Sequence, residues 1–358
     1  MLNYSVHPEV YHTHANYKGL INMLEGIWVR NHDPGDGIFY IISGFANYNG
    51  GVRFFKVFEN HLNAGGQVVA IFAGKTSQRL TSLQIVEKLL ELGIEVHVVN
   101  RNRLIHMKCY GVSSDNGNSL VVSSGNFTGP GMSQNVEASI MVTGDHFQDM
   151  NFSWDDLQRN ILNQRWDYHR PTLDNRDTPA WRLLYDEIGG EIVLDDTQRS
   201  TLIITLSASD TSRIDGRVPV GTQYFWLSRY SYDFFPPLTV LNRRGRKRTY
   251  STIITMHYID INETDENCRV TFEAENNLDF RLGTGRLKAT GLVTAGDIAA
   301  ISRIGESEYE LRLFRQATTT YTLLREHAIN HIGNRGKMYG YIENSEFERL
   351  ANVHLNRR

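Results

Sequence analysis

The stretch that decides the fold is Leu104–Ser139, LIHMKCYGVSSDNGNSLVVSSGNFTGPGMSQNVEAS. It holds two short apolar runs typical of strands, and the second of them, Ser119–Ser123, ends in a turn of small polar residues. His106 and Lys108 are two residues apart, so both side chains project from one face if the first run is a strand. An imidazole beside an ammonium group suits a phosphate, because lysine supplies positive charge and histidine can attack phosphorus or carry a proton.

Three further residues of this stretch complete a candidate catalytic set. Ser124 and Asn126 follow the second predicted strand, where a hydroxyl and an amide can donate hydrogen bonds to phosphate oxygens. Glu137 follows Asn126 by eleven residues, and a carboxylate there can orient the imidazole. Each residue alone has an ordinary explanation, since a lone histidine on a strand is more often structural and Ser-Ser-Gly-Asn is more often a simple turn. From their ordered combination we predict that His106, Lys108, Ser124, Asn126 and Glu137 are catalytic.

The rest of the first half alternates predicted strands with amphipathic helices. Gly37–Gly44 and Gln67–Ala73 are continuous apolar runs, which is typical of strands buried on both faces. Val52–Leu62 and Leu80–Leu92 have helical spacing, and Glu95–Val99 is again typical of a strand. Such alternation predicts a parallel or mixed sheet covered by helices, that is, an α/β fold.

The second half, from about Leu194, has a different residue pattern. Five β-branched stretches separated by turn residues predict a mainly β barrel or sandwich: TLIITLSA, TQYFWLS, YSTIITMHYIDI, CRVTFEAE and YELRLFRQ. Between the halves, residues 166–193 are acidic, contain Pro171 and Pro179, and have no sustained period, so we predict a linker there. The length of 358 residues also favours about two domains.

The charge distribution differs between the halves although the formal net charge is only −3. Residues 1–192 carry 15 basic and 20 acidic side chains, and the remaining residues carry 22 and 20. Five basic residues occupy the six positions of Arg243–Arg248, RRGRKR. This run is either a solvated hairpin tip or a group that binds phosphate.

Cysteine content and hydropathy indicate a reducing compartment away from membranes. The two cysteines, Cys109 and Cys268, lack the paired spacing of a zinc site or a disulfide framework. The N-terminus has no apolar core of secretory length, and no window approaches the roughly 18 apolar residues that span a bilayer. We expect a cytoplasmic protein that contacts no membrane.

The candidate catalytic set resembles the motif of the phospholipase D superfamily, which is His-x-Lys, usually Asp four residues after the lysine, Gly-Ser-x-Asn and a downstream acid. All five candidate residues match. Two positions depart from it, since Val112 stands where aspartate is usual and Ser123 replaces the glycine. Longer segments of both halves resemble the BfiI-type restriction endonucleases, among them Ser43–Phe54, Ser123–Asn135, Tyr232–Thr239 and Phe272–Gly285.

This resemblance implies a domain plan and an activity. Residues 1–165 would form a phospholipase D-like nuclease and dimerisation domain, 166–193 the acidic linker, and 194–358 a β pseudobarrel like the plant B-three DNA-binding domain. The implied protein is a bacterial type IIS restriction endonuclease that binds an asymmetric double-stranded site and cuts outside it without a metal cofactor. A cognate DNA methyltransferase would protect the host site. The charge and family position of the linker further suggest that it is autoinhibitory.

The resemblance also implies how the reaction proceeds. Family chemistry needs two histidines and this chain has one copy of the motif, so a homodimer would share one active site. One His106 would form a covalent phosphohistidine, and the other would protonate the leaving 3′ oxygen. Lys108 and Asn126 would hold the non-bridging oxygens, Ser124 would support them, and Glu137 would fix the orientation of the ring.

DNA contacts are implied in the second half, where arginine can pair with guanine and asparagine with adenine. Trp226 lies in an apolar strand and is equally well explained as a core residue. The implied contacts are Arg213, Thr222, Trp226, Arg244, Asn276, Asn277 and Lys337. Two other functions remain open, namely a nuclease subunit of an ATP-dependent restriction complex and a phospholipase or phosphatidyl transferase with the same chemistry.

Overall fold

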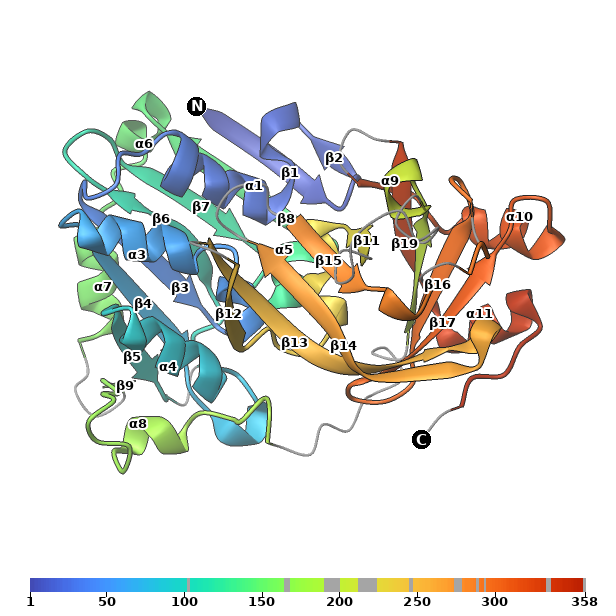
Figure 1. Ribbon diagram of the computed structural model, residues 1–358. Helices are drawn as coiled ribbons and strands as arrows, with labels where there is room; N and C mark the ends of the chain where they lie inside the picture. The colour runs from blue at the N-terminus through green and yellow to red at the C-terminus, as the bar shows by residue number, and fades with distance from the viewer. Residues whose placement is uncertain are drawn as a thin grey trace. The chain divides into compact units, whose positions relative to one another are not determined.

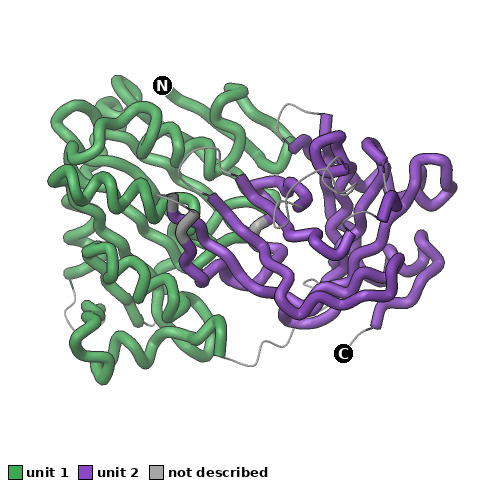
Figure 2. The backbone as a smooth tube through the Cα atoms, in the orientation of Figure 1, with its two compact units in different colours: residues 1–190 green, residues 191–358 purple. Residues whose placement is uncertain are grey.

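The chain divides into two compact units, Met1–Gly190 and Glu191–Arg358 (Figure 2). The computed structural model describes residues 1–101, 104–163, 168–189, 200–211, 224–244, 247–273, 279–287, 290–292, 294–332 and 336–356. Each unit is built on a sheet of its own. Within the described ranges, no helix is long and apolar enough to cross a membrane.

The first unit is a nine-stranded mixed sheet with strand order β2-β1-β8-β7-β6-β3-β4-β5-β9 (Figure 1). Strands β3, β4 and β5 run parallel, and the other neighbouring pairs are antiparallel. The strands are β1 (Leu2–His7), β2 (Tyr11–His12), β3 (Ile38–Ser43), β4 (Gln67–Ala73), β5 (Glu95–Val99), β6 (Lys108–Ser113), β7 (Ser119–Ser123), β8 (Glu137–Thr143) and β9 (Tyr168–His169). The helices are η1 (Ala15–Tyr17), α1 (Gly19–Glu25), η2 (Gly26–Arg30), α2 (Tyr48–Gly51), α3 (Phe55–Asn63), η3 (Thr76–Gln78), α4 (Leu83–Glu91), α5 (Gly129–Ser133), α6 (Asp145–Asp149), α7 (Trp154–Ile161) and α8 (Pro179–Arg182). The predicted α/β fold of this half is confirmed.

The centre of this sheet is apolar on both faces, as its continuous hydrophobic runs predict. Every residue of β4 after Gln67 and every residue of β3 after Ile38 is buried. Helix α4 lies inside the predicted helical range and begins at a polar cap, because the Ser82 hydroxyl accepts from the Ile85 N–H at 3.2 Å. The local signals for strand and helix therefore agree with the tertiary structure here.

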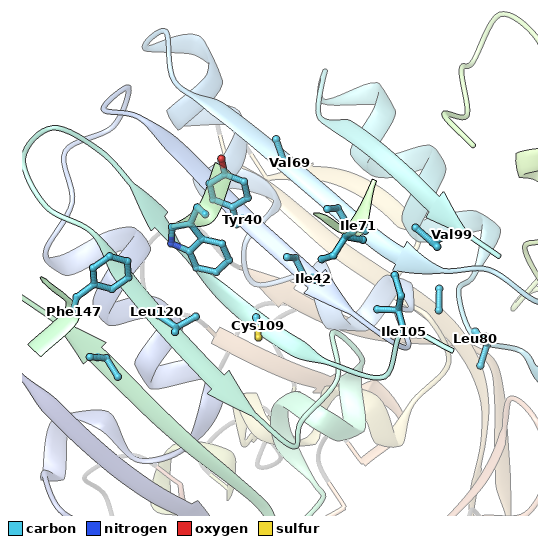
Figure 3. Close-up of a cluster of buried hydrophobic side chains, with 14 residues drawn as sticks. Tyr40, Ile42, Val69, Ile71, Leu80, Val99, Ile105, Cys109, Leu120 and Phe147 are labelled. Atoms are coloured by element: carbon cyan, nitrogen blue, oxygen red, sulfur yellow. The ribbon is translucent and has the colours of Figure 1, made fainter. Parts of the chain in front are cut away.

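Two aromatic layers hold helices against the two faces of the sheet. On one face, the Tyr40 ring stacks on Trp154 of α7 with centroids 4.7 Å apart, within a buried cluster that extends over β3 to β7 (Figure 3). On the other face, Trp28 contacts Phe39 of β3 and Phe58 of α3. Adjacent strand residues point to opposite faces, so Phe39 and Tyr40 anchor one layer each. Packed helices on both faces thus hold the sheet in place beneath the loops at its strand ends.

The segment 168–189 belongs to the first unit, which corrects the predicted boundary at residue 165. Strand β9 pairs with β5, and the Leu83 N–H donates to the Tyr185 carbonyl at 2.8 Å. Glu187 is only 6% exposed. The acidic composition predicted a solvated linker, but these long-range contacts bind the segment to α4 and to the edge of the sheet. Autoinhibition by the linker stays a prediction.

Glu187 is a buried carboxylate with two donors. Its Oε1 accepts from the Ser82 hydroxyl at 2.7 Å and from the Tyr48 N–H at 2.9 Å. Burial nevertheless raises the pKa of Glu187 to about 7, from the ordinary value of 4.5. The folded protein therefore holds this proton more tightly than the unfolded chain does.

Glu187→Gln is expected to flatten the dependence of stability on pH. In the unchanged protein, the stabilisation from protonated Glu187 is fully present below pH 4.5 and is lost as the pH rises through about 7. This shift in pKa corresponds to about 3 kcal/mol in the free energy of unfolding. Glutamine keeps one oxygen for both donors and has no charge. Chemical unfolding between pH 4.5 and 8 measures the effect, with the exposed Glu91→Gln as control, and an unchanged pH dependence in Glu187→Gln would contradict it.

The second unit is a ten-stranded sheet with order β11-β15-β14-β13-β17-β16-β10-β19-β18, and β12 pairs with β13 off this path. All pairs are antiparallel except β13 with β17. The strands are β10 (Ser200–Thr205), β11 (Tyr224–Leu227), β12 (Val240–Arg244), β13 (Lys247–Tyr258), β14 (Glu263–Glu273), β15 (Asp279–Gly283), β16 (Ile298–Arg303), β17 (Glu308–Phe314), β18 (Asn330–Ile332) and β19 (Lys337–Glu343). The helices are α9 (Ala208–Thr211), η5 (Arg229–Phe234), η6 (Ile259–Ile261), η7 (Gly285–Leu287), α10 (Thr319–Arg325) and α11 (Asn344–Ala351).

The predicted pseudobarrel is confirmed for this unit. The five β-branched stretches form β10, β11, β13, β14 and β17. Lys337 of β19 donates to the main-chain carbonyl of Trp226 in β11, so strands near the two ends of the strand order are joined. Phe347 of α11 and Leu324 of α10 pack into an apolar cluster with Ile203 of β10. The sheet is therefore curled and nearly closed, with helices over part of it.

Candidate functional site

The candidate catalytic pair lies where the chain enters β6. Lys108 is the first residue of β6 and is 6% exposed, whereas His106 precedes the strand and is exposed. The side chains still meet, with Lys108 Nζ 3.1 Å from Nδ1 and 3.3 Å from Nε2 of His106. Lys108 Nζ also donates to the His106 carbonyl at 2.6 Å. The ammonium group of Lys108 therefore lies close to both nitrogens of the ring.

Lys108 is a partly desolvated cation beside that ring. Burial lowers the pKa of Lys108, and the negative charge of Glu137 acts in the opposite direction. A phosphate placed against Nζ would supply the charge-assisted hydrogen bonds that burial has removed. The residue is therefore suited to hold an anion next to His106.

Glu137 is the first residue of β8 and lies beside the end of β7. The Ser124 hydroxyl donates to Glu137 Oε2, and Ser124 Oγ accepts from the Ala138 N–H at 3.0 Å. Asn135 Nδ2 donates to Glu137 Oε1 at 3.1 Å. Both carboxylate oxygens are thus engaged locally, and among the described residues the carboxylate makes no hydrogen bond to His106. In this conformation Lys108 contacts the ring, and the orienting role of Glu137 stays a prediction.

Asn126 is held in a fixed orientation by the turn after β3. Its Oδ1 accepts from the Phe45 N–H at 3.1 Å, and the Ser43 hydroxyl oxygen lies 3.4 Å away. Ser43 Oγ accepts from the Phe127 N–H at 2.9 Å and donates to the Phe45 carbonyl at 2.7 Å. With Oδ1 used as an acceptor, Nδ2 is the group that can donate to a ligand. Ser43 is a supporting residue that was not among the predicted ones, and the Ser-Gly pair at the end of a buried strand was the available signal.

The turn between Ser124 and Asn126 requires glycine. A Cβ atom at Gly125 would lie 2.6 Å from the Gly131 carbonyl oxygen. The Gly125 N–H donates to Ser123 Oγ at 2.9 Å, so the serine that replaces the motif's glycine supports this turn. The described residues contain no group of three or more histidines, cysteines or acids that could hold a metal ion. The ammonium, amide and hydroxyl donors suit an anion.

The predicted DNA contacts are described unevenly. Arg213, Thr222, Asn276 and Asn277 lie outside the described residues. For Arg244 the structure describes the main chain, which ends β12 and pairs with Lys247 of β13. The described residues of the basic run therefore lie on the paired strands β12 and β13, where Arg243 pairs with Arg248 and Arg244 with Lys247.

Trp226 and Lys337 are both in ordered strands. The Trp226 ring is half-buried and lies 5.0 Å from the ring of Tyr224 and 5.3 Å from the guanidinium of Arg281. Lys337 is 4% exposed, and its Nζ donates to Asp210 Oδ2 at 2.8 Å. Burial lowers the pKa of Lys337, against the opposing effect of the Asp210 charge. The geometry of Lys337 is that of a buried ion pair and does not support the predicted DNA contact.

Comparison with protein-family models matches residues 194–354 to a family described as the metal-independent restriction enzyme BfiI DNA-binding domain. Residues 194–354 are thus similar to a BfiI-type DNA-binding domain. The match spans nearly all of the second unit and confirms the resemblance for it. The metal independence in the description agrees with the prediction of no metal cofactor. A comparison with curated proteins gave no match.

Similar solved structures cover parts of the chain. Nuc from Salmonella typhimurium, a phospholipase D family member, is 13% identical with a TM-score of 0.35, over 48% of this chain and 98% of that one. NucT from Helicobacter pylori is 11% identical with a TM-score of 0.31, over 40% and 86%. The N-terminal domain of Helicobacter pylori LlaJI.R1 is 15% identical with a TM-score of 0.25, over 40% and 97%. The BfiI-type assignment itself comes from residues 194–354.

Proposed function

We propose that the chain is a type IIS restriction endonuclease that cleaves double-stranded DNA without a metal ion, through a phosphohistidine at His106. One observation supports the proposal: the His106–Lys108 pair and the fixed Asn126 amide offer hydrogen-bond donors suited to an anion, in a chain whose residues 194–354 match a BfiI-type DNA-binding domain. A DNA-bound chain meets phosphodiesters, and the donors at this site are of the kinds that bind phosphate.

In the proposed reaction, a neutral ring nitrogen of His106 attacks the scissile phosphorus and the bond to the 3′ oxygen breaks. The partner subunit's His106 gives its proton to that oxygen. Water then attacks the phosphohistidine and yields a proton to the partner's His106, while the N–P bond breaks to release a 5′ phosphate. Lys108 and Asn126 hold the non-bridging oxygens, where negative charge develops, and Ser124 supports them.

An exposed apolar face beside the site supports a homodimer. Tyr4 of β1 pairs with Ile140 of β8, which pairs in turn with Val122 of β7. These side chains are 37%, 41% and 45% exposed, so adjacent apolar groups on three strands face solvent. Ser124 follows the same β7 and Glu137 begins the same β8. A second copy of this face would cover the apolar groups and bring two catalytic sets together, as the single motif requires.

The test is incubation of the purified full chain with plasmid DNA in EDTA and without ATP, followed by sequencing of the ends. We expect discrete cuts at a fixed distance from a common sequence. Cleavage that requires ATP and another subunit would favour the restriction complex. Hydrolysis of phosphatidylcholine vesicles in place of DNA would favour the phospholipase. A strict requirement for Mg²⁺ would contradict the proposed mechanism.

The remaining expectations follow from the same assignment. Arg213, Thr222, Trp226, Arg244, Asn276 and Asn277 are the proposed DNA-contacting residues. A restriction endonuclease of this type needs a methyltransferase to protect the host site, and we place both in a bacterial cytoplasm.

A further inference from the structure

Trp226 lies on β11, the edge strand of the second sheet among the strands that the structure describes. Strand β11 is the end strand and pairs with β15 on one side. On the other side, the Trp226 N–H donates to Asp210 Oδ1 at 2.9 Å, and the Trp226 carbonyl accepts from Lys337 Nζ. The backbone groups of an edge strand ordinarily face water or pair with another chain. Here an ion pair between two side chains takes the place of a neighbouring strand.

This ion pair is buried, and both carboxylate oxygens of Asp210 accept hydrogen bonds. Asp210 is 0% exposed and lies 2.8 Å from Lys337 Nζ. Its Oδ2 also accepts from the Ser207 N–H at 2.8 Å and from the Ser207 hydroxyl at 2.6 Å. Removing either charge would leave the other buried without compensation. Such a pair is costly to disturb, so it fixes the main chain of Trp226 firmly.

The ring of Trp226 is held separately from its main chain. Arg281 lies over it, and the Arg281 guanidinium forms an ion pair with Glu273 at 2.8 Å. The Arg281 and Glu273 side chains are 11% and 4% exposed. One ion pair thus fixes the backbone of Trp226 and a second one fixes the cation above its ring.

Asp210 and Trp226 flank a stretch of the chain that contains two proposed DNA contacts. Asp210 precedes the stretch 212–223, which contains the proposed contacts Arg213 and Thr222, and Trp226 follows that stretch. Lys337 comes from a part of the chain 127 residues away from Asp210. A single buried pair therefore joins both flanks of a proposed recognition segment to β19.

We propose that Asp210 and Lys337 are positioning residues that fix Trp226 for DNA recognition, and that Lys337 itself does not touch DNA. The inference rests on the proposed function, in which Trp226 belongs to the surface that reads the site. It opposes the direct role that the family resemblance implies for Lys337, and the two roles predict different responses to substitution.

Asp210→Asn separates the two roles by the sign of its effect. If Lys337 contacts phosphate, removing the nearby carboxylate leaves DNA affinity unchanged or raises it. If the pair positions Trp226, affinity for the specific duplex falls by about 10-fold or more, because an amide cannot accept all the hydrogen bonds of the carboxylate. The probe is a duplex enriched from a random-sequence library by the unchanged full chain. Glu346→Gln removes a half-exposed carboxylate of α11 that is paired with Arg349, and it is the matched control. Thermal melting establishes that the variants fold.

Lys337→Arg is the second variant and decides the question if Asp210→Asn does not fold. Arginine keeps the positive charge and would preserve a phosphate contact, but its wider fork does not fit the buried bonds to Asp210 and Trp226. We expect Lys337→Arg to lose affinity for the selected duplex. For a duplex of random sequence, the slope of log affinity against log salt concentration should stay unchanged. Retained specific affinity in Lys337→Arg would overturn the inference. The inference would also be overturned if Lys337→Gln reduced the magnitude of the slope of log affinity against log salt concentration by about 0.9, which is the value for one lost phosphate contact. Failure of the unchanged chain to enrich any sequence would instead count against the proposed function.

Discussion

Replacing His106 by alanine is expected to abolish DNA cleavage and to leave DNA binding unchanged. In the proposed shared site, this ring would supply the attacking nitrogen and, from the partner subunit, the proton for the leaving oxygen. One substitution therefore removes two functions, and we expect the cleavage rate to fall by at least about 10⁴-fold. His106 is exposed and its ring contacts Lys108 and the edge of Phe45, so the melting temperature should not change.

The matched control is His146→Ala, which removes an exposed histidine of α6 in the same unit. Single-turnover cleavage of plasmid DNA in EDTA and gel shifts with the selected duplex measure the two activities separately. His146→Ala should cleave like the unchanged chain. Cleavage by His106→Ala within about tenfold of the control rate would exclude His106 as the nucleophile, because general acid-base and nucleophilic roles both exceed that factor.

The strands of the first unit could be predicted where the local signal was strong. Gln67–Ala73 and Glu95–Val99 were predicted with the bounds of β4 and β5, because a continuous apolar run is itself the signature of a strand buried on both faces. His106 fell outside its predicted strand for a reason that is not local. Strand β3 ends at Ser43, which pairs with Lys108, so residues before Lys108 have no partner in β3.

The motif identified the residue types of the site but not their partners. Ser43 aligns the Asn126 amide from 83 residues away, and Glu187 reaches Ser82 across 105 residues. The family resemblance implied a DNA contact for Lys337, yet its charge is satisfied by Asp210 from a distant segment. Each of these contacts depends on the fold of a whole unit, and no periodicity or spacing in the chain encodes it.

The proposed mechanism depends on the formation of a covalent intermediate. A phosphohistidine would join a DNA fragment to His106 through its 5′ phosphate, and water would remove it in the second step. The link is a P–N bond, which resists alkali and is cleaved by acid. We expect hydrolysis to be the slower of the two steps, so that the adduct accumulates during a single turnover.

The most direct measurement is mass spectrometry of the peptide that contains His106, after an alkaline quench of single-turnover cleavage in EDTA. We predict a nucleotide adduct on His106 that appears with the first cut ends, decays as product forms, disappears on acid treatment and is absent from His106→Ala. Accumulation of cut DNA while this peptide stays unmodified at every time point would contradict the account.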